Sequence, residues 1–389
     1  MLGNMRALPS ILVLLLAISA AGSQAVAGDD DSVLKNLHTV STIASTVPAN
    51  GDVNPYGVAE VPRTVGKLTQ GHILVSNFNN FHNAQGTGTT IVDVAPDGAV
   101  SLFAQINAAT LPGYCPGGVG LTTALVVLRS GWVVVGSLPT SDGTAATAQA
   151  GCLIVLDNSG NPVETFFGSL ISGPWDMAAL DGGDKAWLFV TNVLNGTVAA
   201  NGSVVNRGTV VRINLGVSGT SMPWIESMTV IGSGFAERTD PAALVIGPTG
   251  VGLSPTSCSP SDQDDCRTLW GREREPVLYV ADSLNNRITA IPCAITRDHS
   301  DGNGTTLTSG GSLNGPLGLI VTEGGHILTV NSGDGYITEI TPQGNQIARA
   351  QLDNSGSPAG AGALFGLIYE PSRGVIFVDD ATNTLNLFH

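Results

Sequence analysis

The chain has 389 residues, of which 42% are hydrophobic and 12% are charged, and its formal net charge at pH 7 is −15. A chain with so few Lys and Arg residues has no basic stripe to neutralise phosphates, which argues against a nucleic-acid partner. The same balance argues against binding to anionic membrane surfaces. Gly, Val, Ile, Leu and Thr are abundant while Lys and Glu are scarce, which favours strands over long helices.

Residues 1–27 have the pattern of a secretory signal peptide. Arg6 supplies a short basic start, an apolar stretch runs from Ile11 to Ala21, and Ala25-Val26-Ala27 fits a small-x-small cleavage site. The apolar stretch is short for a membrane span, although an N-terminal anchor is the alternative. We therefore predict a mature protein of residues 28–389 that has no membrane span, is secreted or periplasmic, and is monomeric.

An internal repeat runs through the mature chain. A short apolar strand that ends in a polar or small pair recurs six times, and another apolar strand, usually opened by Gly or Pro, precedes each one. The six endings are Ser76-Asn77, Gly136-Ser137, Thr191-Asn192, Ala281-Asp282, Val330-Asn331 and Asp379-Asp380. A third and a fourth strand follow, around turns such as Pro96-Asp97-Gly98. Such a four-stranded antiparallel unit cannot bury both faces alone, but a closed ring of units can.

Two segments carry a family resemblance. The segment from Tyr279 to Ile288 resembles the core of an NHL repeat, and Gly315-Pro316-Leu317-Gly318-Leu319 resembles the opening of one. The resemblance extends over nearly the whole mature chain and is strongest in the fourth and fifth units. NHL repeats form four-stranded propeller blades, so six of them imply an all-β, six-bladed β-propeller in a single domain, residues 28–389.

The sixth unit has only three strands before the chain reaches His389. A ring closed in this way would leave an unpaired strand edge. Residues 37–46 read as a strand and precede the first complete unit. We therefore predict that this N-terminal segment supplies the outer strand of the last blade.

Long loops gather at one end of the predicted propeller. This end, here called the top, carries the loops between the second and third strands and the connections between blades. Insertions at 79–88, 139–150 and 194–208 fall there in blades 1 to 3, whereas the same loops are short in blades 4 to 6. Long loops on a rigid scaffold commonly carry recognition, so the top of blades 1 to 3 is the predicted site, unless the insertions are tolerated without a function.

The five cysteines fit this arrangement. Cys115 and Cys152 both fall at the top of blade 2, which predicts a disulfide that fastens its loop. Cys258 and Cys266 flank an acidic loop at the bottom of blade 4, and Cys293 ends a strand of the same blade. We predict a Cys258–Cys266 bond, with Cys266–Cys293 as the alternative and one thiol left unpaired.

Candidate ligand-binding residues at the channel are Tyr56, Asn77, His82, Trp175, Asp176 and Asn192. Tyr56 and Trp175 begin innermost strands, where they could stack on a sugar or another small ligand or pack between blades. His82 lies in the top loop of blade 1. Asn77 and Asn192 end strands, where short polar side chains also satisfy the following turn.

The resemblance also raises the question of a metal. Lactonases of the gluconolactonase type hold a divalent cation in the channel with a Glu, Asn residues and an Asp. Here the innermost strands offer Glu60 and Asp176 without matching Asn residues, a small set for calcium, which takes six to eight oxygens.

Motifs of the common hydrolases are absent from the sequence. No Gly-x-Ser-x-Gly elbow, His-Glu-x-x-His helix or Cys-x-x-Cys pair occurs. We therefore predict a non-catalytic binding or scaffold propeller without a cofactor, whose top face recognises a protein, a small molecule or a carbohydrate. The alternative is a lactonase-like hydrolase or lyase acting in the central channel, with or without a divalent cation such as Ca²⁺.

Overall fold

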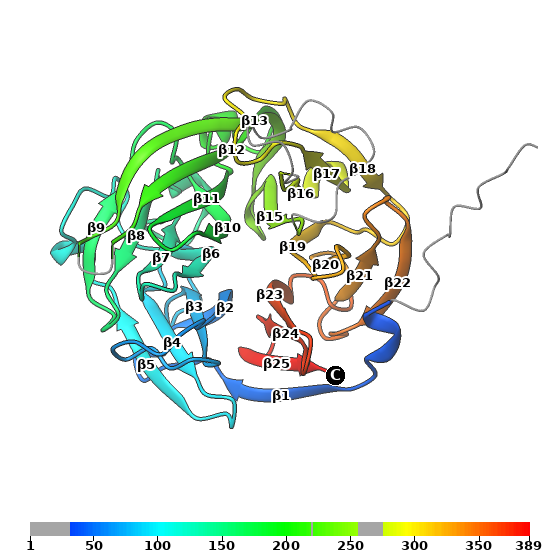
Figure 1. Ribbon diagram of the computed structural model, residues 1–389, viewed down its shortest axis with the longest axis horizontal. Helices are drawn as coiled ribbons and strands as arrows, with labels where there is room; N and C mark the ends of the chain where they lie inside the picture. The colour runs from blue at the N-terminus through cyan, green and yellow to red at the C-terminus, as the bar shows by residue number, and fades with distance from the viewer. Residues whose placement is uncertain (1–31, 219–220, 256–274) are drawn as a thin grey trace, which may run out of the picture. The chain divides into compact units, whose positions relative to one another are not determined.

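A computed structural model describes residues 32–218, 221–255 and 275–389 of the chain. These residues form six antiparallel sheets arranged as blades around a central axis (Figure 1). In the described residues, helix is confined to α1 (Thr197–Ala200) and a few short 3-10 turns, and no helix there is long and apolar enough to cross a membrane. The predicted all-β, six-bladed propeller is confirmed, while the predicted signal peptide lies outside the described residues.

In blades 1 to 5 the innermost strand comes first along the chain and the strands then run outward. Blade 1 consists of β2 (Val53–Glu60), β3 (Ile73–Asn79), β4 (Thr90–Val94) and β5 (Val100–Gln105). Blade 2 consists of β6 (Leu121–Val127), β7 (Val133–Ser137), β8 (Cys152–Leu156) and β9 (Pro162–Phe166). Blade 3 consists of β10 (Pro174–Asp181), β11 (Lys185–Asn192), β12 (Val205–Gly216) and β13 (Trp224–Asp240), with β14 (Leu244–Ile246) added to its sheet.

The remaining blades follow the same order, except that blade 6 takes its fourth strand from the N-terminal part of the chain. Blade 4 consists of β15 (Pro248–Leu253), β16 (Leu278–Asp282), β17 (Arg287–Ile291) and β18 (Thr305–Ser309). Blade 5 consists of β19 (Pro316–Val321), β20 (Ile327–Asn331), β21 (Tyr336–Ile340) and β22 (Gln346–Gln351). Blade 6 consists of β23 (Leu364–Glu370), β24 (Gly374–Asp379), β25 (Thr384–Phe388) and β1 (Val40–Ser45).

Burial falls from the second strand of each blade to the outermost strand. Every residue of β3, β7, β16, β20 and β24 is buried, because neighbouring blades cover both faces of these strands. The outermost strand β5 instead exposes Val100 and Leu102 to solvent. This explains why the inner strands read as nearly continuous apolar runs, with little polar alternation.

The N-terminal strand closes the ring. β1 pairs antiparallel with β25, from Val40 opposite Phe388 to Ser45 opposite Thr384, and Figure 1 shows it running beside the C-terminus. The prediction that residues 37–46 complete the last blade is confirmed. β25 therefore has no unpaired edge, because β1 covers it.

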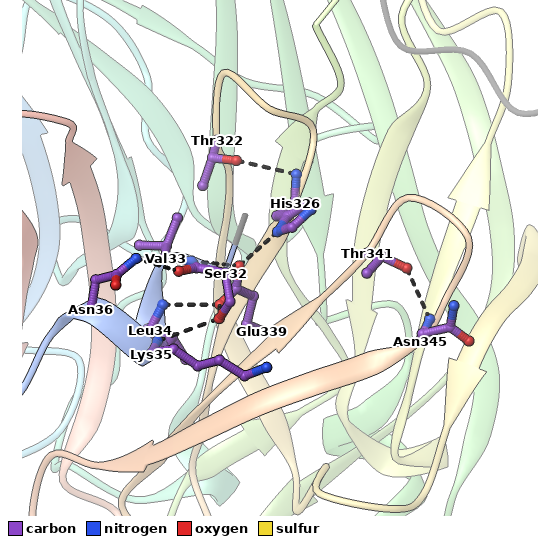
Figure 2. A network of polar contacts seen from close by, with 10 residues as sticks. All are labelled: Ser32, Val33, Leu34, Lys35, Asn36, Thr322, His326, Glu339, Thr341 and Asn345. Atoms are coloured by element: carbon purple, nitrogen blue, oxygen red, sulfur yellow. Dashed lines mark hydrogen bonds and ion pairs between the residues drawn. The ribbon is translucent and has the colours of Figure 1, made fainter. Parts of the chain in front are cut away.

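A buried carboxylate fixes the chain just before β1 (Figure 2). Glu339 of β21 is fully buried and accepts hydrogen bonds from Ser32 Oγ at 2.6 Å and from the N–H groups of Val33 and Leu34 at 2.9 Å each. His326 Nδ1 lies 2.6 Å from Glu339 Oε1, the oxygen that also accepts the N–H of Val33. Burial alone would raise the pKa of Glu339, but these hydrogen bonds outweigh it and lower the pKa.

Blade 3 departs from the predicted repeat. β13 is 17 residues long and continues past its blade into a short hairpin with β14, where Asp240 lies opposite Leu244. This β13–β14 hairpin was not predicted. In blade 2 the innermost strand begins at Leu121, after the segment Gly118-Val119-Gly120.

The predicted disulfide between Cys115 and Cys152 is confirmed, with their Cα atoms 5.3 Å apart. Cys293 is also disulfide-bonded, so it is not an unpaired thiol. Cys258 and Cys266 lie outside the described residues, and the bond predicted between them is therefore not described.

Candidate functional site

The strand register shows which side chains reach the top of the channel. In each blade, a residue at or near the start of the innermost strand pairs with a residue at or near the end of the second strand. The pairs are Pro55–Asn77, Leu121–Ser137, Pro174–Asn192, Pro248–Asp282, Pro316–Asn331 and Leu364–Asp379. Asp379, and not Asp380, is therefore the blade 6 counterpart of the other five residues. The sequence-based alignment was wrong by one residue in this blade.

Two of these strand-end residues, Asn77 and Asn192, form hydrogen bonds with nearby backbone groups. Asn77 donates from Nδ2 to the carbonyl of Thr46 at 3.0 Å, and Asn192 accepts through Oδ1 from the N–H of Ser172 at 3.2 Å. Both asparagines are fully buried. Neither lines a described pocket, so the structure gives no support to their predicted role in ligand binding.

An aromatic cluster fills the upper channel. The Tyr56 ring lies between the rings of Phe78 and Phe365, with centroid distances of 4.5 and 3.8 Å and an interplanar angle of 17° in each case. Trp175 meets Tyr56 edge-on at 5.8 Å. Because both faces of Tyr56 are covered, this ring packs between blades and offers no open face for stacking on a sugar.

A pocket of about 450 Å³ lies against this aromatic cluster at the top of the channel. Tyr56, Trp175, Leu317 and Phe365 form its apolar side. Its polar groups come from blades 1, 4, 5 and 6, namely Asn54, Gln85, Thr249, Ser283, Ser332 and Asp380. The set includes two predicted ligand-binding residues, Tyr56 and Trp175.

The β13–β14 hairpin covers one side of this top pocket. Ala242, Ala243, Val245 and Ile246 contribute to the lining. Gln85, from the top loop of blade 1, donates from Nε2 to the carbonyl of Ala242 at 2.7 Å. The hairpin therefore reaches across the channel from blade 3 to blade 1.

Asp380 brings ionisable chemistry into the top pocket. It directly follows Asp379, in the position that Phe78 holds in blade 1. Burial, and then the neighbouring Asp379 carboxylate, raise the pKa of Asp380 to about 7. Among the described residues no side-chain or backbone group forms a hydrogen bond with its carboxyl group, while its own N–H is fixed by the carbonyl of Ala363 at 2.8 Å.

A carboxyl group with a pKa near 7 can both give and take a proton at neutral pH. Tyr56 behaves differently, because burial and the nearby Asp380 raise the pKa of its phenol well above the usual value. The phenol therefore stays protonated. The top pocket thus combines an apolar wall with one proton-exchanging group, the pattern expected of a small-molecule site.

The predicted residue Asp176 lies in the lower channel, beside a second cavity of about 280 Å³ with mostly aliphatic walls. Its carboxylate accepts hydrogen bonds from the N–H groups of Met177 at 2.8 Å and Val251 at 3.3 Å. Burial nevertheless raises the pKa of Asp176 to about 7. The second bond ties blade 3 to blade 4.

The predicted pair Glu60 and Asp176 does not form a calcium cage. Glu60 ends β2, where burial and then Glu370 raise its pKa while Arg373 lowers it. In the part of the chain that the structure describes, no three His, Cys, Asp or Glu side chains come together in a way that could hold a metal ion. Calcium takes six to eight oxygens, so the described donor set does not fit it.

His82 lies outside both cavities. It is exposed in the loop between β3 and β4, and its ring lies 3.8 Å from the ring of Phe81. Of the predicted long top loops, the structure brings only parts to the top pocket, mainly Gln85. The pocket depends equally on blades 4 to 6, through Ser283, Ser332 and Asp380.

Sequence reasoning missed Asp380 and Gln85 as site residues. A signal for Asp380 was present, because counting from the start of each innermost strand aligns it with Phe78, Leu138, Val193, Ser283 and Ser332. The other five blades have an apolar or hydroxyl side chain at this position, so the carboxyl group of Asp380 differs from all of them. Gln85 had no such signal, since its role depends on the unpredicted hairpin.

Comparison with family models and with curated protein sequences finds no match. Among solved structures, the chain is similar to a luciferin-regenerating enzyme, with 10% identity over 90% of this chain and 94% of that chain and a TM-score of 0.53. It is also similar to regucalcin, a calcium-binding protein from Agrobacterium tumefaciens, with 14% identity over 88% and 92% of the two chains and a TM-score of 0.52.

A third similar structure is a gluconolactonase from Xanthomonas campestris, with 13% identity over 90% of this chain and 88% of that chain and a TM-score of 0.51. Identities this low establish the fold and not the activity. The chain therefore has the six-bladed propeller fold of the gluconolactonase- and regucalcin-like proteins.

Proposed function

We propose that the protein is an enzyme of the hydrolase or lyase type that acts on a small molecule in the top pocket, with Asp380 as the proton-transferring group. The observation that carries this proposal is the unpartnered Asp380 carboxyl group, whose pKa is raised to about 7 inside a largely apolar pocket. A general acid or base works best when its pKa lies near the working pH. This favours the enzymatic alternative over the non-catalytic function predicted first.

The fold neighbours support the same choice. Two of the similar structures are described as a gluconolactonase and a luciferin-regenerating enzyme, both of them catalytic propellers. In the hydrolase case, Asp380 would take a proton from a water molecule while the oxygen of that water bonds to the carbonyl carbon of the substrate. The proton would then pass to the leaving alkoxide as the carbon–oxygen bond breaks. No step is assigned to a metal, because the described carboxylates do not fit one.

The test is a turnover screen with chromogenic esters and with lactones, the latter followed by proton release. The wild-type protein is compared with Asp380→Asn and with Asp353→Asn, a carboxyl group of the connection between blades 5 and 6 that does not line the pocket. We expect Asp380→Asn to lower kcat/KM by about 10²- to 10⁴-fold, the usual contribution of a general acid or base, and Asp353→Asn to leave it nearly unchanged. Full activity in Asp380→Asn would remove the proposal.

A further inference from the structure

The hydroxyl groups in the top pocket are already committed to the protein. Ser283 donates from Oγ to the carbonyl of Pro316 at 2.6 Å, and Thr249 Oγ1 lies 2.8 Å from Ser283 Oγ. Ser332 donates from Oγ to the carbonyl of Gly315 at 3.0 Å. A hydroxyl group has a single proton to donate. Thr249 lies within 3.4 Å of three carbonyl oxygens of the chain as well, those of Ala281, Pro316 and Leu317. None of the three hydroxyls therefore has a proton left for a ligand.

The rest of the polar lining offers little to a polyol. Gln85 uses Nε2 on the carbonyl of Ala242, and its Oε1 is buried without a partner. Asp380 and the buried Asn54 of blade 1 are the two polar side chains of the lining that remain. A sugar that fills this pocket would bring four or more hydroxyl groups. Each hydroxyl group that leaves water without forming a new hydrogen bond to the protein weakens binding by about 1–3 kcal/mol.

Tyr56 offers no open stacking platform. Both faces of its ring are covered, by Phe78 and Phe365, and Trp175 is turned edge-on to the same cluster. Leu317 and the β13–β14 hairpin add aliphatic walls. The usual ring-on-ring contact with a pyranose is therefore not available at Tyr56.

The pocket lining excludes anions as well. Among the described residues that line it, no Lys, Arg or His supplies a positive charge, and Asp380 is acidic. A carboxylate or phosphate group on the ligand would be desolvated without a counter-charge. Sugar acids and phosphorylated compounds do not fit.

We infer that the top pocket takes a compact, uncharged and largely apolar molecule with a single carbonyl group, of the class of alkyl-substituted lactones, esters and cyclic ketones, rather than a sugar or sugar acid. The carbonyl faces Asp380, and the alkyl part fills the space between Leu317, Phe365 and the hairpin. This inference takes its pocket from the proposed function and adds the substrate class.

Binding to the wild-type protein tests the inference without any turnover. The probes are 4-tert-butylcyclohexanone, a six-membered ring with one carbonyl and no bond to hydrolyse, and myo-inositol, a six-membered ring that carries only hydroxyl groups. Isothermal titration and the shift in melting temperature report binding. We expect the ketone to bind and raise the melting temperature, and at least 100-fold weaker binding of inositol. The inference would be overturned if inositol bound at a lower concentration than the ketone, or if the ketone did not bind up to its solubility limit.

Two variants locate the binding. Val245→Thr places a hydroxyl group in the apolar lining at constant shape, and we expect it to weaken ketone binding about 5- to 10-fold. Thr341→Ala removes a hydroxyl from an exposed turn that does not line the pocket, and we expect ketone binding to stay within about twofold of wild type. Unchanged ketone binding in Val245→Thr, or a large loss in Thr341→Ala, would contradict the inference.

The two proposals fail separately. Ketone binding without turnover of any ester or lactone would leave the substrate class standing and remove the enzymatic function. Turnover that depends on Asp380 but prefers hydroxylated lactones would support the enzymatic function and rule out the substrate class.

Discussion

Asp380 occupies in blade 6 the position that Phe78 occupies in blade 1, since each follows the residue that pairs with the start of its innermost strand. Phe78 is fully buried against Tyr56, whereas Asp380 faces the same aromatic cluster with a carboxyl group. One blade of the ring thus places an acid where the repeat otherwise places an apolar side chain or a small hydroxyl. An acid at such a position is unfavourable for stability, which is typical of functional residues.

Replacing Asp380 with Leu, the size class of Leu138 in blade 2, is expected to stabilise the fold. An unfolded Asp releases its proton near pH 3.8, whereas the folded protein holds it up to about pH 7. Wild-type stability therefore falls as pH rises from about 4 to about 7, and the variant escapes this fall. Melting curves should show a gap in favour of Asp380→Leu that grows across this range and then levels off. Parallel melting temperatures at all pH values would contradict it.

Glu237 of β13 is expected to make the top of blade 3 less stable as pH rises from acidic to neutral and mildly alkaline values. Its side chain is fully buried and accepts the N–H of Asn195 at 3.0 Å, at the start of the long top loop. Burial raises the pKa of Glu237 to about 8, while hydrogen bonds from Asn195 lower it. The folded group is thus still protonated where an unfolded Glu is ionised, so stability declines between about pH 4.5 and pH 8.

The comparison is Glu237→Gln, which keeps the acceptor for Asn195 and has no charge to bury. Hydrogen exchange of the Asn195 amide should be more strongly protected in the variant than in the wild type at pH 9. The two proteins should be alike at pH 4. Greater protection of the wild type at pH 9 would disprove the role of Glu237.

The anchor in Figure 2 predicts an acid-sensitive ring closure. Because the folded pKa of Glu339 is lowered, its contribution is present above the unfolded pKa near 4.5 and is lost as pH falls below it. Glu339→Gln should therefore reduce the free energy of unfolding at pH 7 by about 2–3 kcal/mol, the scale of hydrogen bonds to a charged group. Denaturant unfolding at pH 7 and at pH 3.5 measures this, and the difference should shrink at the lower pH.

Thr341→Ala is the matched control in the same blade. It removes the hydroxyl that accepts the N–H of Asn345 at 3.2 Å in an exposed turn. We expect a loss of less than about 1 kcal/mol without a pH dependence over this range. If the two variants lose equally, the anchor has no special role.

The disulfide between Cys115 and Cys152 is expected to stabilise the protein substantially. The bond closes a loop with a sequence separation of 37. A loop of this length corresponds to about 4 kcal/mol of chain entropy removed from the unfolded state. The double variant Cys115→Ser, Cys152→Ser should unfold at a clearly lower denaturant concentration than the wild type. An unchanged midpoint would show that the loop is held by other contacts.

The sequence was sufficient to predict the elements that a repeat dictates. The strand from Val40 to Ser45 followed from the missing fourth strand of blade 6, and the Cys115–Cys152 bond followed from the placement of both residues at the top. These predictions depend on counting strands, and strand alternation is well marked in the sequence. The NHL assignment itself remains a prediction, since the similar structures share the fold only.

The candidate site was harder to predict because it depends on single-residue register. Asp379 and Asp380 are both acidic, and only counting from the start of the innermost strand tells which one faces the blade and which one faces the channel. In blade 2, Gly118-Val119-Gly120 looks like a strand opening, yet Leu121 is the residue that pairs with Ser137. The segment Leu244–Ile246 is short and apolar, so it could not be separated from the start of blade 4.

The closure of the ring has a consequence for the order of folding. The N–H groups of His38 and Thr39 donate to the carbonyl of His389 at 2.9 and 2.8 Å, and the N–H of His389 donates back to Thr39 at 2.9 Å. Of the strands that the structure describes, a ribosome makes β1 before all others and its partner β25 after all others. β1 therefore has no partner strand until β25 has been synthesised, and until then its edge is open to pairing with other strands. Pairing of β1 with β25 is thus the last strand pairing of the ring that synthesis allows.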